Sequence, residues 1–257
     1  MNFKELHFQE SPILICNVWD VVSAKAAQEL NFKSIGTSSG AIASMLGYPD
    51  GEKMSFTELE YIVERITKST ELPLTVDLEA GYSRNPSEIV ENIIKLTNLG
   101  VVGVNIEDSI VGEKRELMSS DSFAELLEKI NSSLIQQNQE VFINVRTDTF
   151  LIGISNPIQE TIERAKKYKN AGAGGLFVPC IVKEKDIAAV IENIDLPLNV
   201  MCMPNLPDFV TLQKLGVKRI SMGGFVQSKL TKVLEKELSS ILQNNSFENL
   251  FAKSITQ

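Results

Sequence analysis

Three carboxylate side chains stand where two short apolar segments end, and together they could bind a metal ion. Asp77 and Glu79 close one segment and lie on the same side of it if it is a strand, and Glu107 closes the next segment. Because no cluster of lysines matches them, these carboxylates repel one another unless they are protonated or bind a cation. Oxygen ligands suit Mg²⁺ or Mn²⁺, and the distance of the only histidine, His7, along the chain disfavours zinc. We therefore expect a Mg²⁺ site, with Mn²⁺ as a second possibility; the other interpretation is solvated loop starts.

Arg146 ends another apolar segment and is the first candidate for binding an anion. A guanidinium group in such a position needs a negatively charged partner. That partner is either an anionic substrate or, in a purely structural salt bridge, Glu107 or Asp148. Both interpretations stay open on the residues alone.

Two glycine-containing turns could also receive an anion. A predicted helix begins at Ser39 and Gly40, and its free N–H groups could bind a carboxylate or phosphate. The alternative is that Ser38 or Ser39 merely caps this helix. The turn of residues 222–224, Met-Gly-Gly, resembles the turn at which many barrels bind phosphate.

Eight apolar segments rich in β-branched residues must position these side chains. They alternate with amphipathic segments such as residues 55–68, which have the periodicity of helices. An open doubly wound sheet would also alternate, but eight units within 257 residues favour closure. We therefore predict an α/β fold, a single (β/α)₈ TIM barrel domain spanning residues 1–257. The predicted strands are residues 13–18, 34–38, 72–77, 102–107, 141–146, 175–179, 197–201 and 219–223.

The chain continues after the eighth predicted strand, and residues 228–257 form a predicted C-terminal helical extension. Apolar residues recur at helical spacing over residues 228–244, and a tail with Phe247, Leu250 and Phe251 follows. We expect part of the helix to close the outer ring of the barrel. The apolar tail has no partner in its own domain, so we expect it to dock on a neighbouring subunit.

Composition excludes several classes of partner. The formal net charge is −8 with both signs interspersed, which argues against nucleic acid and anionic membranes as partners. An anionic substrate would need a local cation. The N-terminus lacks a signal-peptide pattern and no long apolar run occurs, so we expect a cytoplasmic protein. Three widely spaced cysteines, Cys16, Cys180 and Cys202, are expected to be reduced core thiols.

Six motifs, in order along the chain, resemble the isocitrate lyase and phosphoenolpyruvate mutase superfamily. The resemblance covers roughly residues 12–230, nearly the whole chain. The motifs are Asn17-Val18-Trp19-Asp20, Gly36-Thr37-Ser38-Ser39-Gly40-Ala41, Leu46-Gly47-Tyr48-Pro49-Asp50, Asp77-Leu78-Glu79-Ala80-Gly81-Tyr82, Gly103-Val104-Asn105-Ile106-Glu107-Asp108 and Asn144-Val145-Arg146-Thr147-Asp148.

The resemblance implies a specific site. It implies one Mg²⁺ bound, directly or through water, by Asp50, Asp77, Glu79 and Glu107. It implies that a small anionic carboxylate substrate is bound by Trp19, Ser38, Ser39, Gly40, Ala41 and Arg146, with Arg146 and Asp50 also catalytic. Members of the superfamily typically exchange the last helix between subunits, which implies a homodimer or homotetramer.

One loop departs from the superfamily pattern. Isocitrate and methylisocitrate lyases share a Lys-Lys-Cys-Gly-His loop after the fourth strand, and its cysteine is the catalytic acid or base. Residues 111–118 contain neither Cys nor His, nor the Lys-Thr-Asn-Ser pattern of phosphonopyruvate-handling members. Lys114, with Arg115 or Glu116 as alternatives, is the candidate replacement; an exposed charged loop is the other interpretation.

We therefore expect a Mg²⁺-dependent lyase that cleaves a carbon–carbon bond in a small 2-hydroxy or 2-oxo carboxylate through a pyruvate-like enolate. The metal would stabilise charge on the enolate oxygen. One alternative is phosphorus–carbon chemistry, as a mutase or hydrolase of phosphonopyruvate or carboxyphosphonoenolpyruvate. Further alternatives are a phosphate-binding barrel suggested by Gly223 and Gly224, and a non-catalytic barrel.

Overall fold

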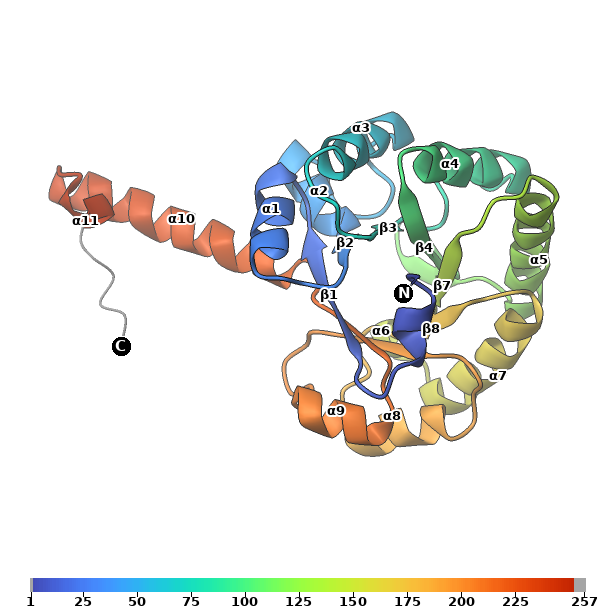
Figure 1. Ribbon diagram of the computed structural model, residues 1–257. Helices are drawn as coiled ribbons and strands as arrows, with labels where there is room; N and C mark the ends of the chain where they lie inside the picture. The colour runs from blue at the N-terminus through green and yellow to red at the C-terminus, as the bar shows by residue number, and fades with distance from the viewer. Residues whose placement is uncertain (1, 252–257) are drawn as a thin grey trace.

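Eight parallel strands close into a barrel in the computed structural model, which describes residues 2–251. Around the barrel the strands follow the order β1-β10-β9-β8-β7-β4-β3-β2. Each of the eight predicted segments overlaps one of these strands, so the predicted (β/α)₈ barrel is confirmed (Figure 1). The strands are β1 Ile13–Val18, β2 Ile35–Thr37, β3 Leu74–Asp77, β4 Val101–Glu107, β7 Phe142–Arg146, β8 Gly175–Phe177, β9 Leu198–Met201 and β10 Arg219–Ser221.

Helices surround the ring of strands and cover its outer face (Figure 1). They are α1 Val21–Glu29, α2 Ser39–Leu46, α3 Phe56–Thr67, α4 Pro86–Asn98, α5 Ser120–Gln136, α7 Pro157–Asn170, α8 Glu184–Ile191 and α9 Phe209–Leu215. The one-turn helix α6, Thr149–Ile152, follows β7 at the carboxyl end of the barrel. Two further helices, α10 Phe225–Asn244 and α11 Glu248–Phe251, follow the last strand. No helix within residues 2–251 is both long and apolar enough to cross a membrane.

Helix α3 illustrates how local sequence determines these elements. The hydroxyl of Ser55 accepts a hydrogen bond from the Glu58 N–H, and the Glu58 side chain accepts one from the Ser55 N–H, a reciprocal cap that starts the helix. Leu59, Val63 and Ile66 follow at helical spacing and are completely buried against the barrel. Burying one such side chain contributes about 1.5–3 kcal/mol, so this stripe decides which face of α3 packs inward.

The N-terminal segment closes the barrel at the end where the strands begin. The 3₁₀ helix η1, Glu5–Phe8, lies across the ring of strands in Figure 1. His7 is 1% exposed and stacks on Phe142 with 4.1 Å between ring centroids, while Phe3 meets both rings edge-on. Burial, followed by the positive charge of Arg219, lowers the pKa of His7 from 6.5 to about 3. His7 is therefore a neutral part of the core at physiological pH.

A short hairpin stands over the other end of the barrel. Strands β5 Ser109–Val111 and β6 Arg115–Leu117 pair antiparallel. From the sequence we expected a loop over residues 111–118, because strands of only three residues carry too little pattern to be recognised. The hairpin matters because it determines which charged residue faces the barrel.

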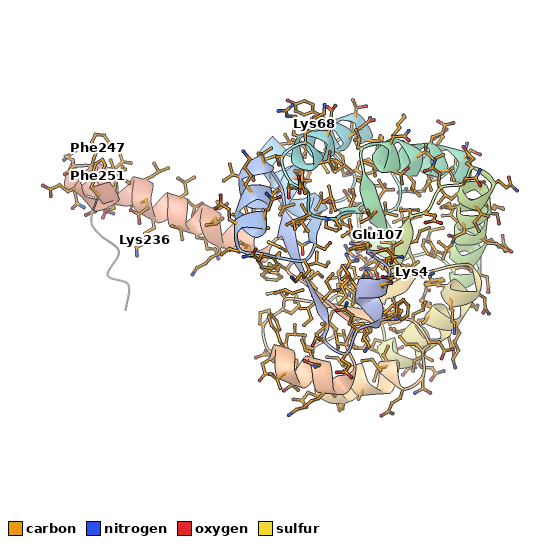
Figure 2. All side chains as sticks on the ribbon, viewed as in Figure 1. Lys4, Lys68, Glu107, Lys236, Phe247 and Phe251 are labelled. Atoms are coloured by element: carbon orange, nitrogen blue, oxygen red, sulfur yellow. The ribbon has the colours of Figure 1, made fainter. Side chains whose placement is uncertain are left out.

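Helix α10 projects away from the barrel (Figure 1). It has no buried residue, so the expectation that part of it closes the outer ring is wrong. The predicted helix is otherwise confirmed, beginning at Phe225 rather than at residue 228 and ending at Asn244. The tail residues Phe247 and Phe251 lie at the far end of this arm, and both are more than 60% exposed (Figure 2). Part of the predicted tail, residues 252–257, lies outside the described residues.

The three cysteines are free thiols, in agreement with the expected absence of a disulfide framework. Cys16 and Cys180 are half-buried. Cys202 is exposed, so the expectation that all three are core thiols is wrong for this residue. It comes directly after β9, whose apolar run ends at Met201, and the chain there already leaves the core.

Candidate active site

A cavity of about 690 Å³ opens at the carboxyl ends of the barrel strands. The last residue of six strands lines it: Thr37, Asp77, Arg146, Phe177, Met201 and Ser221. Six of the predicted site residues also line it: Ser38, Ser39, Gly40, Asp50, Asp77 and Arg146. The barrel thus brings together residues that are more than a hundred positions apart in the chain.

Asp77 lies at the centre of the acidic side of the cavity. Its Oδ2 accepts hydrogen bonds from the Ser39 hydroxyl at 2.7 Å and from the Ser39 N–H at 3.4 Å. Its Oδ1 is buried and has no hydrogen-bond partner among residues 2–251. Asp50 approaches from the loop after α2, where its carboxylate lies against Gly40; a Cβ built on Gly40 would stand 3.2 Å from Asp50 Oδ1. Asp77 thus has one buried oxygen without a partner, and both Asp77 and Asp50 line the cavity.

Glu79 lies behind Asp77 in a strained turn. Its backbone adopts the left-handed region at φ 51°, an uncommon conformation for a residue with a side chain. One carboxylate oxygen accepts from the Glu52 N–H at 2.7 Å and the other from the Tyr82 hydroxyl at 3.1 Å. Burial, followed by the negative charges of Asp77 and Asp50, raises the pKa of Glu79 to about 8. Repulsion among carboxylates, expected from the sequence, is therefore present at this position.

Arg146 is held between two buried carboxylates. Its Nε donates to Asp148 Oδ1 at 2.7 Å, and its Nη1 lies 3.1 Å from Glu107 Oε2. Both partners left open by the sequence analysis are therefore present. Burial lowers the pKa of Arg146, but the two carboxylates outweigh this effect and raise it above its usual range. Arg146 is permanently charged and rigidly oriented, and it still lines the cavity.

The hairpin β5–β6 adds a second arginine to this network. Arg115 Nη1 lies 2.5 Å from Glu107 Oε1 and 2.7 Å from Asp148 Oδ2. The Ser109 hydroxyl, also on the hairpin, donates to Asp148 Oδ2 at 2.6 Å. Figure 2 shows Glu107 inside the ring of strands. The ion pairs therefore tie the hairpin to the carboxyl ends of β4 and β7.

Lys114 occupies a different environment from Arg115. It is exposed in the turn between β5 and β6 and does not line the cavity, whereas Arg115 does. Antiparallel pairing of Val111 with Arg115 leaves residues 112–114 in the turn. The catalytic role of Lys114 stays a prediction, and the geometry favours Arg115 for any contact with a bound molecule.

The start of helix α2 combines capping with a free donor. Ser38 is the cap: its hydroxyl accepts from the Ala41 N–H at 3.3 Å. The Ser39 N–H is directed to Asp77. The Gly40 N–H has no acceptor among residues 2–251, and Gly40 lines the cavity. Ala41 is buried and does not line the cavity. One helix N–H thus remains available for an anion.

The glycine turn after β10, residues 222–224, has two of its three N–H groups already occupied. Asn17 Oδ1 accepts from the Met222 N–H at 2.7 Å and from the Gly223 N–H at 3.1 Å. Gly223 and Gly224 still line the cavity, and a Cβ built on Gly224 would stand 3.6 Å from the Ser38 hydroxyl oxygen. The pairing with Asn17 removes two of the three backbone donors that a phosphate could use at this turn. It therefore argues against the phosphate-binding alternative.

Trp19 lies away from the cavity. It lines an apolar groove between α1 and the beginning of α10, together with Val22 and Leu230. Its predicted role in substrate binding stays a prediction that this placement does not favour.

Sequence reasoning missed a polar layer inside the barrel. Asn105, Asn144, Asn199 and Arg219 are all buried there, and Asn105 and Arg219 form part of the cavity lining. Asn144 Nδ2 donates to Asn105 Oδ1 at 2.9 Å and to Asn199 Oδ1 at 3.1 Å. A signal existed: β4, β7 and β9 each contain one asparagine among apolar residues, and the last barrel strand, β10, begins with an arginine.

The acidic side of the cavity fits a divalent cation that keeps several water ligands better than one that is coordinated by protein groups alone. As they stand, no three Asp, Glu, His or Cys side chains within residues 2–251 form a group that could hold a metal ion. Glu107 is turned towards Arg115 and Arg146, and Glu79 towards Glu52 and Tyr82. Mg²⁺ usually keeps several waters and uses one or two carboxylates, and the unpaired Oδ1 of Asp77 meets that requirement.

Comparisons with known proteins show to which family the chain is similar. Residues 3–242 match the family described as phosphoenolpyruvate phosphomutase. An oxaloacetate decarboxylase of Pseudomonas syringae pv. tomato is 30% identical, with 99% of this chain and 89% of the relative covered. An uncharacterised protein of Mycobacterium tuberculosis is 34% identical, with 87% and 82% covered. A crystal structure of a provisionally assigned phosphonomutase from Burkholderia cenocepacia is 33% identical with a TM-score of 0.87, and the match covers 92% of this chain and 97% of that one.

Proposed function

We propose that this chain, which belongs to the phosphoenolpyruvate phosphomutase family, is a Mg²⁺-dependent lyase that cleaves a carbon–carbon bond in a small 2-oxo or 2-hydroxy carboxylate. Membership makes the protein a lyase or mutase of the phosphoenolpyruvate mutase and isocitrate lyase superfamily. One observation carries the proposed metal-dependent chemistry on an anionic substrate: the cavity lining combines Asp77, which has an unpaired oxygen, with Gly40 and Arg146, which can face an anion.

Asp77 and Asp50 would hold the ion, directly or through water. Glu79 and Glu107 would accept hydrogen bonds from the water molecules that are bound to the ion. No ion pair joins Asp50, Asp77 or Glu79 to a basic side chain within residues 2–251, which supports a cation as the missing partner. When bound, Mg²⁺, or Mn²⁺ in its place, would supply Lewis-acid stabilisation of negative charge on substrate oxygens.

The protein side of the reaction would consist of binding, orientation and proton transfer. The free Gly40 N–H at the start of α2 would receive the substrate carboxylate. Arg146, fixed by Glu107 and Asp148, would face the substrate from the carboxyl end of β7 and help to orient it. Bond cleavage leaves an electron pair on the carbon beside the carbonyl, and that carbon must take up a proton. Asp50, exposed at the cavity and beside Gly40, is our candidate for moving this proton.

Oxaloacetate is the first substrate to test, because relatives covering nearly the whole chain carry the name oxaloacetate decarboxylase. In that reaction the bond between carbons 3 and 4 breaks, carbon dioxide leaves, and carbon 3 receives a proton to give pyruvate. The hairpin would cover the cavity during this step, because Arg115 joins it to Glu107 and Asp148.

The decisive experiment measures pyruvate formed from oxaloacetate with Mg²⁺ or with EDTA, after subtraction of the uncatalysed rate. We expect Asp77→Ala to lose roughly a hundredfold or more in turnover, since the unpaired oxygen is removed. Asp195→Ala is the matched control, because Asp195 is an exposed carboxylate before β9, at the opposite end of the barrel. Activity that survives in Asp77→Ala would contradict the mechanism.

A phosphonomutase is the second candidate, favoured by the family description and by the similar structure from Burkholderia cenocepacia. Phosphorus NMR of phosphonopyruvate incubated with the protein and Mg²⁺ distinguishes the two. The phosphonomutase would be the correct assignment if phosphonopyruvate is turned over and no pyruvate is released from oxaloacetate or from a panel of 2-hydroxy acids.

We also propose that α10 mediates assembly into a homodimer or homotetramer. Its apolar residues Leu230, Leu234 and Leu238 recur every four positions and are each more than half exposed. An apolar groove between α1 and α10 continues this surface at Val22 and Leu30. A second copy of the chain would cover both surfaces by exchanging α10.

A further inference from the structure

Arg219 is a charged side chain in the interior of the barrel with almost no partner. It is 2% exposed, yet it forms part of the cavity lining. Its Nη2 donates to Asn105 Oδ1 at 3.3 Å, while Nε and Nη1 have no hydrogen-bond partner among residues 2–251. No carboxylate within the described part of the chain forms an ion pair with it.

The neighbouring amides do not supply the missing acceptor. Asn105 Oδ1 is the one oxygen that accepts from Arg219 among the described residues. The same oxygen also accepts from Asn144 Nδ2 at 2.9 Å, so it is shared between the two donors. The nearby histidine His7 is neutral and offers no negative charge. Burial lowers the pKa of Arg219 to about 9, only partly offset by the negative charge of Asp77. The guanidinium is still charged at neutral pH, and a buried charge without a partner is strongly unfavourable.

Arg146 and Arg219 therefore differ in what they offer to a bound molecule. The charge of Arg146 is already matched by Glu107 and Asp148. Arg219 has two N–H positions that remain unmatched, and the Ser221 hydroxyl lines the cavity from the same strand. An anion bound at this position would accept hydrogen bonds from a charged donor. These hydrogen bonds would offset the free-energy cost of burying the Arg219 charge.

We propose that Arg219 is a second anion-binding residue of the cavity and binds the second carboxylate of a dicarboxylate substrate. This inference rests on the proposed function and narrows its substrate class from small 2-oxo and 2-hydroxy carboxylates to dicarboxylates. The Gly40 N–H takes one carboxylate, and Arg219 takes the other inside the barrel.

Two ligands that differ only at one end test the proposal. Malate carries a second carboxylate where 2-hydroxybutyrate carries a methyl group. Equilibrium binding of both to the full chain is measured by calorimetry at one fixed Mg²⁺ concentration. In Arg219→Met we expect malate affinity to fall roughly ten- to a hundredfold, while 2-hydroxybutyrate affinity stays unchanged. Arg219→Lys should recover part of the loss, and Arg65→Met, at an exposed position on α3, should change neither ligand.

Two results would overturn the proposal. An equal loss of affinity for both ligands in Arg219→Met would mean that Arg219 only shapes the cavity. No loss of affinity for either ligand would mean that Arg219 does not contact the substrate. If Arg219→Met does not fold, crystals of the wild-type protein soaked in malate give the answer. A malate carboxylate on the Arg219 guanidinium supports the proposal; water or chloride there, with malate bound elsewhere, refutes it.

The test is separate from that of the proposed function, because binding needs no turnover. If oxaloacetate is not cleaved but the preference for malate depends on Arg219, only the assigned reaction fails. If oxaloacetate is cleaved and the preference for malate is the same in Arg219→Met, only the role of Arg219 fails.

Discussion

Arg164 Nη1 donates to Asp108 Oδ2 at 2.8 Å, and this buried ion pair joins α7 to the residue that follows β4. The same oxygen accepts from the Thr147 and Tyr168 hydroxyls, each at 2.7 Å. Asp108 is fully buried beside Glu107, so the two neighbouring acids have different environments. Glu107 belongs to the arginine network of the cavity, and Asp108 to a structural network that fixes the end of β4.

Breaking the Asp108 network should destabilise the protein without touching the cavity. Arg164→Met leaves a buried carboxylate without its cation, which typically costs about 3–5 kcal/mol in the free energy of unfolding. Arg65→Met, at an exposed site on α3, should change it by less than about 0.5 kcal/mol. Urea unfolding followed by circular dichroism measures both. A loss below about 1 kcal/mol in Arg164→Met would show that the pair does not stabilise the fold.

Arg115 should hold the hairpin closed. Arg115→Met removes its ion pairs to Glu107 and Asp148, so the hairpin should open more often. We expect faster cleavage after Glu113 or Glu116 by a glutamate-specific protease, together with a fall in turnover of roughly tenfold or more. Lys114→Met is the matched control, because Lys114 is exposed in the turn and should affect neither rate. Equal proteolysis rates in the two variants would contradict the role of Arg115.

His7 should make the stability depend on pH in the mildly acidic range. Its pKa is about 3 in the fold and 6.5 as a free side chain, so protonation favours the unfolded chain. The contribution of neutral His7 to the free energy of unfolding is therefore fully present above pH 6.5. It is lost as the pH falls from 6.5 towards 3, by about 1.4 kcal/mol per pH unit. His7→Gln cannot titrate, so the free energy of unfolding should fall less steeply between pH 6.5 and 5. Parallel slopes for the two proteins would show that His7 is already protonated in the fold.

Assembly should depend on the apolar face of α10. Leu234 and Leu238 are 58% and 53% exposed, and a second copy of the chain would cover them. Leu234→Glu combined with Leu238→Glu should reduce the mass measured by light scattering to that of a single chain. Lys236→Glu places the same charge between them on a side chain that is already polar, and should leave the mass unchanged (Figure 2). A wild-type protein that is monomeric at high concentration would refute the proposed assembly.

The barrel and the position of the cavity followed from the sequence because both depend on local pattern. Eight apolar segments with helical segments between them favour closure, and the carboxyl ends of parallel strands meet at one end. Asp77 and Arg146 could therefore be placed at the cavity from their positions at the ends of β3 and β7. The exact reaction did not follow, because the loop over residues 111–118 carries no recognised catalytic motif.

Only the tertiary structure decided which neighbouring residues face inward. The choice of Arg115 over Lys114 depends on the register in which two strands of three residues pair, and no periodicity can show that in so short a segment. The placement of Trp19 in a groove beside α10 depends on the direction that α10 takes from the barrel. The unmatched charge of Arg219 depends on which side chains surround it inside a closed barrel. Residue types and spacing thus determined where the chemistry lies, and contacts between distant strands determined which side chains are free to perform it.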